Sequence, residues 1–201
     1  MDILKTKENL ERLGYIVRLF DTKEEASAYL DREIDRTTVA FGGSVTLQEL
    51  GLFERLSKHN DVLWHTMADE QPEKAAIRRK AVNTSVYVTS ANGVAETGEI
   101  INIDGIGNRV ASTLFGHDRV YFVVGENKIA PDHDSALFRA RNTAAPKNAQ
   151  RLNVKTPCAV KGDHCYNCSS PQRICRGLVV FWENLIGAHT EIVLVKETLG
   201  Y

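Results

Sequence analysis

The residues of this sequence whose types and spacing best suit chemistry are its four cysteines, which form one cluster in the segment 157–176. Their spacing is C-x6-C-x2-C-x6-C, and they are Cys158, Cys165, Cys168 and Cys175. Two thiols in a Cys-x-x-Cys pair can face one ion from a tight turn, and the flanking cysteines can complete a four-sulfur shell where the chain folds back. The segment between them is rich in turn-forming residues, as such a fold-back requires. The pattern therefore predicts a metal site.

A shell made only of thiolates suits zinc or an iron–sulfur cluster, because both are soft enough to prefer sulfur. Zinc ribbons have two separated Cys-x-x-Cys pairs, whereas this chain has one. The outer gaps of six residues fit a cubane 4Fe–4S cluster, whose irons lie farther apart than four ligands on one zinc. We expect an iron–sulfur cluster, with zinc as the alternative and with two disulfides or buried free thiols as the remaining interpretations.

The compartment bears on the disulfide interpretation, since disulfides need an oxidising environment. The first residues, MDILKTKENLERLGY, are charged from position 2 onward and lack the apolar core of a signal peptide. No apolar run approaches the length of a membrane span. We therefore expect a cytoplasmic protein without a membrane-spanning segment.

Length and charge limit the remaining classes. A chain of 201 residues is long enough for one well-packed domain, and we expect a single domain over 1–201. The net charge is −1 with acids and bases interspersed, so there is no basic field that would indicate a nucleic-acid partner. A homo-oligomer is compatible with this composition.

Short β-rich runs alternate with helical patterns along the chain. Strands are predicted at 14–20, 37–43, 61–66, 85–91, 99–104, 119–125, 177–182 and 191–197, and helices at 22–34, 45–56, 72–82, 106–116 and 135–145. The composition of 142–150 predicts a loop, the segment 92–99 a loop projecting from the sheet, and the last strand closes the sheet. Apolar strands separated by helices predict an α/β fold with a central, largely parallel sheet covered on both faces.

In open α/β sheets, ligands bind beyond the carboxyl ends of the strands. The first loop predicted there contains Gly42, Gly43, Ser44 and Thr46, between a strand and a helix. The glycines let backbone amides approach an anion, and the hydroxyl groups can donate hydrogen bonds to it. The alternative is a tight turn in which Ser44 only caps the helix.

The second loop spans 90–99 and carries Glu96, Thr97 and Gly98. A carboxylate held between two glycines and flanked by buried strands can act as a general base or nucleophile, so Glu96 is the candidate catalytic residue. The alternative is that Glu96 is a solvated loop acid and that the glycines serve only the turn.

A third set of candidates is basic. Asn108 and Arg109 start a predicted helix, and Lys128 follows the most strongly β stretch. Arg109 and Lys128 could clamp a carboxylate or a phosphate, although a surface position is the commoner one for either residue alone. His65 ends a predicted strand and is interpreted as structural.

Several segments resemble, in order along the chain, those of the lactate-utilisation (LUD) domain proteins. They are GGSVTLQELGL, TSANGVAETGEIINI, GNRVASTLFGHDRVYFVVGENKI, PCAVKGDHCYNCSSPQRIC and the ending VLVKETLGY. The resemblance implies the three-layer α/β fold of ribose-5-phosphate isomerases and CoA transferases. Some members belong to bacterial operons that oxidise L-lactate to pyruvate alongside iron–sulfur subunits. This chain resembles the short stand-alone members with one cysteine cluster rather than the large operon subunit, which has a separate ferredoxin-like region.

These observations favour an accessory or electron-transfer component that handles a small hydroxy or keto acid, or a phosphorylated metabolite. No flavin or nicotinamide motif is visible, so a hydride acceptor would come from a redox partner protein. Two alternatives stay open. One is a self-contained isomerase- or acyl-transfer-type enzyme that uses Glu96, and the other is a non-catalytic ligand-binding module with structural zinc.

Overall fold

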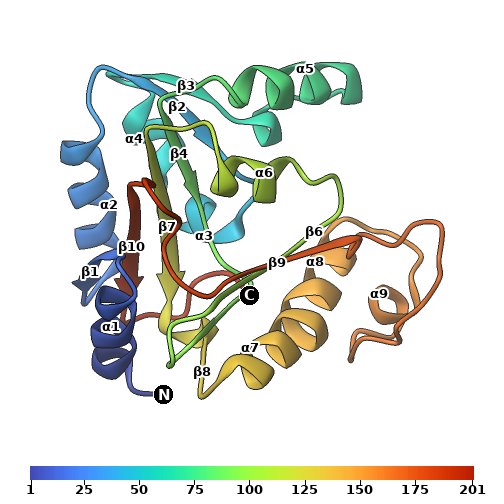
Figure 1. Ribbon diagram of the computed structural model, residues 1–201. Helices are drawn as coiled ribbons and strands as arrows, with labels where there is room; N and C mark the ends of the chain where they lie inside the picture. The colour runs from blue at the N-terminus through green and yellow to red at the C-terminus, as the bar shows by residue number, and fades with distance from the viewer.

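The computed structural model describes residues 1–201, and its centre is a parallel sheet of six strands (Figure 1). The order is β1 (Ile16–Phe20), β10 (Thr190–Val195), β7 (Arg119–Gly125), β4 (Val86–Thr89), β2 (Thr38–Phe41) and β3 (Asp61–Leu63). All five neighbouring pairs are parallel, which confirms the predicted sheet. The last strand does not close the sheet, however, because β10 lies between β1 and β7.

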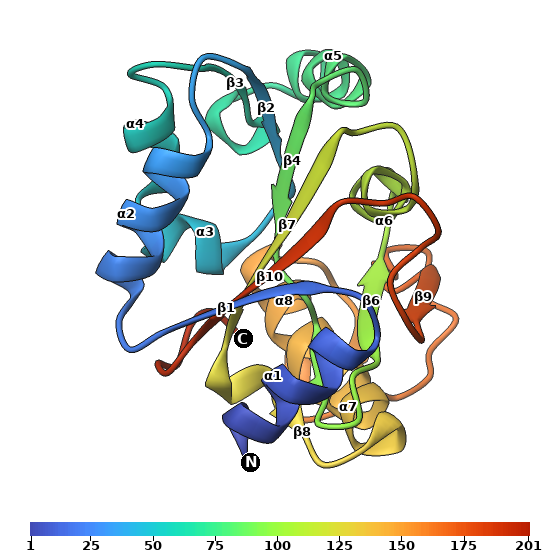
Figure 2. The ribbon, with the colours of Figure 1, turned by 60° about the vertical axis from the view of Figure 1, so that its left-hand side comes forward.

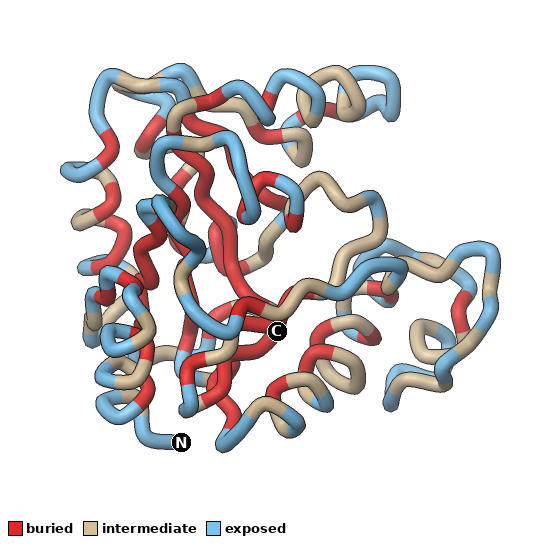
Figure 3. Tube along the Cα trace, in the orientation of Figure 1, coloured by how far each residue is buried: buried red, intermediate tan, exposed pale blue.

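The central strands are largely buried, as their red colour in Figure 3 shows, and both faces of the sheet carry apolar core residues. On one face Val193 and Val195 join a core cluster with residues of α2 (Lys23–Glu33), α3 (Val45–Glu49) and α4 (Leu52–Leu56). On the other face Ile192 and Leu194 pack with residues of α1 (Ile3–Arg12) and α5 (Gln71–Ala81). The three-layer α/β fold follows from strands that are apolar on both sides.

Local signals explain where several helices begin and end. Thr22 and Glu25 form a capping box at the start of α2, as the sequence pattern predicts. The predicted helix over 45–56 is divided into α3 and α4 by Gly51, whose φ of 61° lies in the left-handed region. The prediction of one continuous helix there was wrong.

A second sheet, of four strands, lies beside the first (Figure 2). Its order is β8 (Ile129–Ala130), β5 (Gly93–Ala95), β6 (Ile100–Asp104) and β9 (Gly177–Phe181). The predicted loop 92–99 is therefore largely the strand β5 and the turn that joins it to β6. Strand β6 pairs antiparallel with both β5 and β9.

The predicted loop at 142–150 was also wrong, because this part of the chain is helical. Helix α7 (His133–Arg139) continues through a π-helical segment (Ala140–Ala144) into α8 (Ala145–Arg151). Helix α6 (Asn108–Leu114) follows β6, and α9 (Pro157–Lys161) opens the cysteine segment, at the right-hand edge in Figure 1. Each helix is either too short or too polar to cross a lipid bilayer.

Candidate functional site

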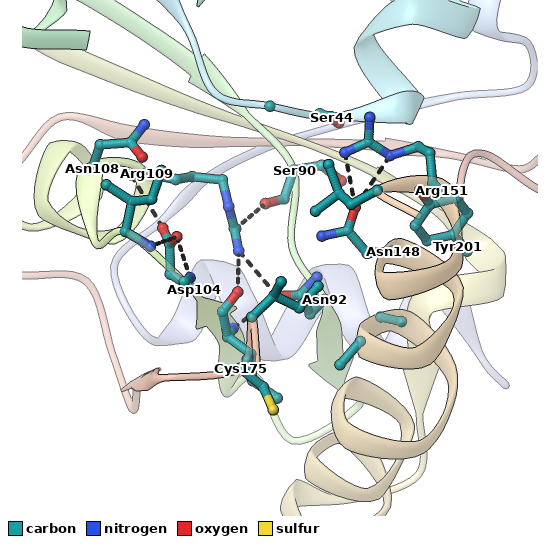
Figure 4. Close-up of a pocket in the computed structure, with 18 of the residues that line it drawn as sticks. Ser44, Ser90, Asn92, Asp104, Asn108, Arg109, Asn148, Arg151, Cys175 and Tyr201 are labelled. Carbon is teal, nitrogen blue, oxygen red and sulfur yellow. Dashed lines mark hydrogen bonds between the residues drawn. The ribbon is translucent and has the colours of Figure 1, made fainter. Parts of the chain in front are cut away.

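A cavity of about 330 Å³ lies at the carboxyl ends of the parallel strands, where the sequence predicts a ligand (Figure 4). The turns after β2, β3, β4 and β7 contribute Ser44, His65, Ser90 and Lys128 to its wall. The π-helical segment and α8 form another part of the wall. The cavity therefore gathers segments far apart in the sequence, and π-helical turns frequently occur at functional sites.

The glycine loop after β2 lines the cavity with some of its residues and packs behind the cavity wall with another. Gly43 and Ser44 line it, and Ser44 also caps α3 by accepting a hydrogen bond from the backbone N of Leu47 at 3.4 Å. Gly42 lies behind the wall, where an added Cβ would be 2.6 Å from Thr89 Oγ1 and 3.2 Å from Arg109 Cδ. Gly42 is thus needed for close packing against the arginine and does not line the cavity.

Arg109 reaches into the region between the two sheets (Figure 4). Its terminal nitrogens donate to the carbonyl oxygens of Ser90 at 3.2 Å and Ile103 at 2.6 Å, and to the side-chain oxygens of Asn92 and Asn102. These bonds hold the guanidinium in place, so Arg109 lines the cavity mainly as a fixed positive charge. Asn108, its neighbour, also lines the cavity, and its role in ligand binding stays a prediction.

Lys128 is only 3 % exposed, and its side chain lies between two hydroxyl groups. Its Nζ donates to Thr46 Oγ1 at 2.7 Å and to Ser90 Oγ at 2.8 Å. Burial, and then the nearby charge of Arg139, lower the pKa of Lys128 to about 7. Thr46 is buried behind the wall and acts on the cavity by holding this amine.

Several lining residues were missed by sequence reasoning: His65, Arg78, Asp104, Asn148, Arg151 and Tyr201. His65 follows β3, so the rule that found Ser44 could have found it too. Arg78 lies on α5 and Arg151 on α8, where no local motif marks either one. The burial of the His65 ring, followed by the charge of Arg78, lowers its pKa to about 4 and keeps the ring neutral near pH 7.

The charge of the cavity is predominantly positive. Arg78, Arg109, Lys128 and Arg151 line it, and the one carboxylate among the lining residues is Asp104. That carboxylate accepts hydrogen bonds from the backbone N–H groups of Arg109 and Val110, both at 3.1 Å, at the start of α6. Such a wall favours an anionic ligand.

Glu96, Thr97 and Gly98 lie outside this cavity. Glu96 accepts hydrogen bonds from the backbone N of Asp2 at 2.8 Å and from Lys5 Nζ at 3.5 Å, so it ties the start of α1 to the hairpin. Gly98 packs against Leu13, and Thr97 donates to Glu99. The catalytic role of Glu96 stays a prediction, and it is not a role in this cavity.

The four cysteines line a second, smaller cavity of about 20 Å³. None is disulfide-bonded, and all are partly exposed. Arg173 Nε donates to Cys175 Sγ at 3.2 Å, and the Cys165 sulfur accepts from the backbone N of Asn167 at 3.4 Å and from Arg141 Nη2 at 3.8 Å. No group of three or more His, Cys, Asp or Glu side chains is close enough to hold one metal ion.

The two cavities share part of their walls. Ala145, Ile174 and Cys175 line both of them, and Cys175 is drawn among the residues of the larger cavity in Figure 4. The backbone N of Arg176 donates to the carbonyl oxygen of Asp104 at 2.9 Å. The end of the cysteine segment is therefore joined to the loop that forms one wall of the larger cavity.

Comparisons with known proteins agree with this architecture. A family model described as the LUD domain matches residues 3–195. Among solved structures, the chain is similar to a DUF162 family protein from Deinococcus radiodurans, with 12 % identity and a TM-score of 0.54, over 96 % of this chain and 95 % of that chain. No curated protein matches the sequence significantly.

Proposed function

Because the chain belongs to the LUD domain family, and is in that sense a lactate-utilisation-type protein, we propose that it binds a small organic anion beside an iron–sulfur cluster. The ligand is a 2-hydroxy or 2-oxo acid held in the cavity at the carboxyl ends of the parallel strands. The protein then acts as an accessory or electron-transfer component that works with a redox partner. The observation that carries this proposal is the shared wall of the two cavities.

The anion-binding part rests on charge and on polar atoms without partners. Four basic side chains line the cavity, whose volume of about 330 Å³ suits a small metabolite. Arg78 Nε and the hydroxyl group of Tyr201 are buried there without a hydrogen-bond partner in the protein. A buried donor without a partner is costly, so both atoms are suited to contact a carboxylate and its hydroxyl or keto oxygen.

The cluster part rests on the chemistry of the donors. Four thiols line one cavity, and Arg141 and Arg173 donate hydrogen bonds to the sulfur atoms of Cys165 and Cys175. Sulfur is the donor type that an iron–sulfur cluster prefers. Hydrogen bonds to the sulfurs also tune the reduction potential of such clusters. Cys158, Cys165, Cys168 and Cys175 would hold the group, which would supply one-electron transfer.

The first test is anaerobic purification followed by iron and acid-labile sulfide analysis. We expect both elements together with absorbance near 400 nm that bleaches on reduction. A colourless protein that holds one zinc per chain would contradict the electron-transfer part and favour the module with structural zinc.

The second test measures binding of pyruvate, L-lactate and inorganic phosphate by calorimetry. Arg78→Met should weaken the binding of the preferred anion, because it removes a charge and a donor from the cavity wall. Arg79→Met is the matched control, since Arg79 is the next residue on α5, is exposed and does not line the cavity. Equal affinities for the two variants would contradict the assignment of the cavity.

A further inference from the structure

Lys128 is a buried amine in the wall of the anion cavity, and it has no carboxylate partner. Its side chain is 3 % exposed, and its amine donates hydrogen bonds to the hydroxyl groups of Thr46 and Ser90 at 2.7 and 2.8 Å. A lysine that only needed to be buried would ordinarily be paired with an acid. This amine is instead held by two neutral groups, on the inner surface of a cavity of about 330 Å³.

The surroundings of Lys128 favour its neutral form. Ser90 accepts from Lys128 through its hydroxyl and from Arg109 through its carbonyl oxygen at 3.2 Å, so the two basic side chains are neighbours. Arg139 donates to the carbonyl oxygens of Asn127 and Asn92 and adds a second positive charge close to the amine. Glu49 is the acidic group that acts in the opposite direction.

A desolvated lysine beside other cations is the arrangement that makes an amine nucleophilic toward carbonyl carbons. Two features of the cavity indicate which class of carbonyl compound this amine would react with. The basic wall suits a carboxylate, and the amine suits a carbonyl group, so a 2-oxo acid satisfies both. A 2-hydroxy acid of the same size has the carboxylate that suits the basic wall but lacks the carbonyl group that suits the amine.

We propose that Lys128 forms a reversible imine with the keto group of a 2-oxo acid bound in this cavity. The lone pair of Nζ adds to the carbonyl carbon, the two protons of the neutral amine pass to the carbonyl oxygen, and the carbinolamine formed on the way loses that oxygen as one water molecule. One C–N double bond replaces one C–O double bond, and no electrons are gained or lost. The step rests on the proposed anion site, and it gives that site a covalent chemistry for keto acids.

The test is reductive trapping. The full chain is incubated with pyruvate and sodium cyanoborohydride, digested and mapped by mass spectrometry. We expect one reduced pyruvate adduct, on the peptide that carries Lys128, and no adduct with L-lactate, which has the carboxylate but no carbonyl. Mapping the wild-type adduct does not depend on how any variant folds. The rate of trapping should rise as the pH increases through about 7, because only the neutral amine attacks.

Lys128→Arg keeps a basic side chain at this position and removes the nucleophilic amine, so it should lose trapping. Lys147→Arg, at an exposed position of α8 outside the cavity, is the matched control and should trap like the wild type. Pyruvate that binds in calorimetry without giving an adduct would overturn the imine and leave the anion site standing. Adducts confined to exposed lysines such as Lys147 would overturn it as well. Absence of both binding and trapping would remove the site and the imine together.

Discussion

At the scale of single residues, the basic side chains of the cavity differ in whether their donors are already used. Some are held by hydrogen bonds to the protein, and others are free to contact a ligand. Arg109 was predicted as a clamp, but its terminal nitrogens already donate to four oxygens of the protein. Arg78 is the better candidate for direct contact, because its buried Nε has no partner. Arg109 therefore sets the potential of the cavity, whereas Arg78 supplies a donor.

His65 gives the site a predictable dependence on pH. Its pKa of about 4 in the folded protein lies below the ordinary value of 6.5, so the unfolded chain binds more protons between these limits. The free energy of unfolding should fall as the pH drops from 6.5 to 4, and it should be insensitive to His65 above 6.5. After allowance for the exposed part of the ring, the contribution is on the order of 1–2 kcal/mol.

Urea unfolding of the wild type and of His65→Asn at several pH values measures this contribution directly. The difference in unfolding free energy between the two proteins should change between pH 4 and 6.5 and stay constant between pH 7 and 8. His59→Asn is a useful comparison, because hydrogen bonds to Asp31 and Asp35 raise the pKa of His59 and its contribution has the opposite sign. A constant difference over the acid range would show that the ring is not buried as described.

Several residues that the sequence predicts for the site line the cavity, whereas Glu96 lies outside it. The position of each residue relative to the strand ends explains the difference. Ser44, Asn108, Arg109 and Lys128 follow strand ends or begin helices, and all of them line the cavity. Glu96 does not, because a short strand that begins at Gly93 carries the chain away from the cavity to α1. A strand of three residues has too few positions for an alternating pattern to reveal it.

At the scale of elements, the junction of β2 with α3 carries two adjacent glycines with different tasks. An added Cβ at Gly42 would lie 2.6 Å from Thr89 Oγ1 and 3.0 Å from the hydroxyl oxygen of Tyr87. At Gly43 the nearest atom is His65 Nε2 at 3.4 Å, which is ordinary contact. The first glycine is required by packing, and the second leaves room in the cavity.

Gly42→Ala should therefore destabilise the protein by about 1–3 kcal/mol, as overpacking does, and should weaken pyruvate binding because Arg109 must shift. Gly43→Ala is the matched control and should unfold at nearly the wild-type urea concentration. Urea unfolding and calorimetry of both variants measure the two effects. Equal stability of Gly42→Ala and the wild type would mean that the loop packs less closely against Thr89 than described.

Most elements of the parallel sheet were predictable because their signals are local. The capping box at Thr22 and the apolar run 119–125 needed no tertiary information. The segment 142–150 failed because its composition resembles a loop, while α7 and the π-helical segment carry the helix into it. Pro146 is the second residue of α8, in the first turn, where the missing N–H of a proline is tolerated.

At the scale of the whole molecule, the cysteine segment and the anion cavity are parts of one structure. Strand β9 follows the cysteines and pairs with β6, so that Gly177 lies opposite Asp104. An added Cβ at Gly105 would lie 2.7 Å from the carbonyl oxygen of Ile174, which shows how closely the two segments pack. The sequence predicted a metal-binding segment but gave no sign of this contact, because it joins residues about seventy positions apart.

This arrangement predicts different effects for two cysteines that would have the same role in the proposed cluster. Cys175 lines both cavities, whereas Cys168 lines only the smaller one. Replacing either by serine should lower the iron content of anaerobically purified protein, since a thiolate ligand is lost. Only Cys175→Ser also changes the wall of the anion cavity directly, so it should alter pyruvate affinity in metal-free protein.

The decisive comparison is calorimetry on metal-free wild type, Cys168→Ser and Cys175→Ser under reducing conditions. Wild type and Cys168→Ser should bind pyruvate with equal affinity, and Cys175→Ser should differ from both. If the loaded wild type then binds pyruvate with a different affinity from the metal-free protein, thermodynamic linkage requires that pyruvate alter metal affinity by the same factor. Identical pyruvate affinities for all of these forms would mean that the shared wall does not couple the two cavities. Binding at the cysteines and binding of the anion would then be independent.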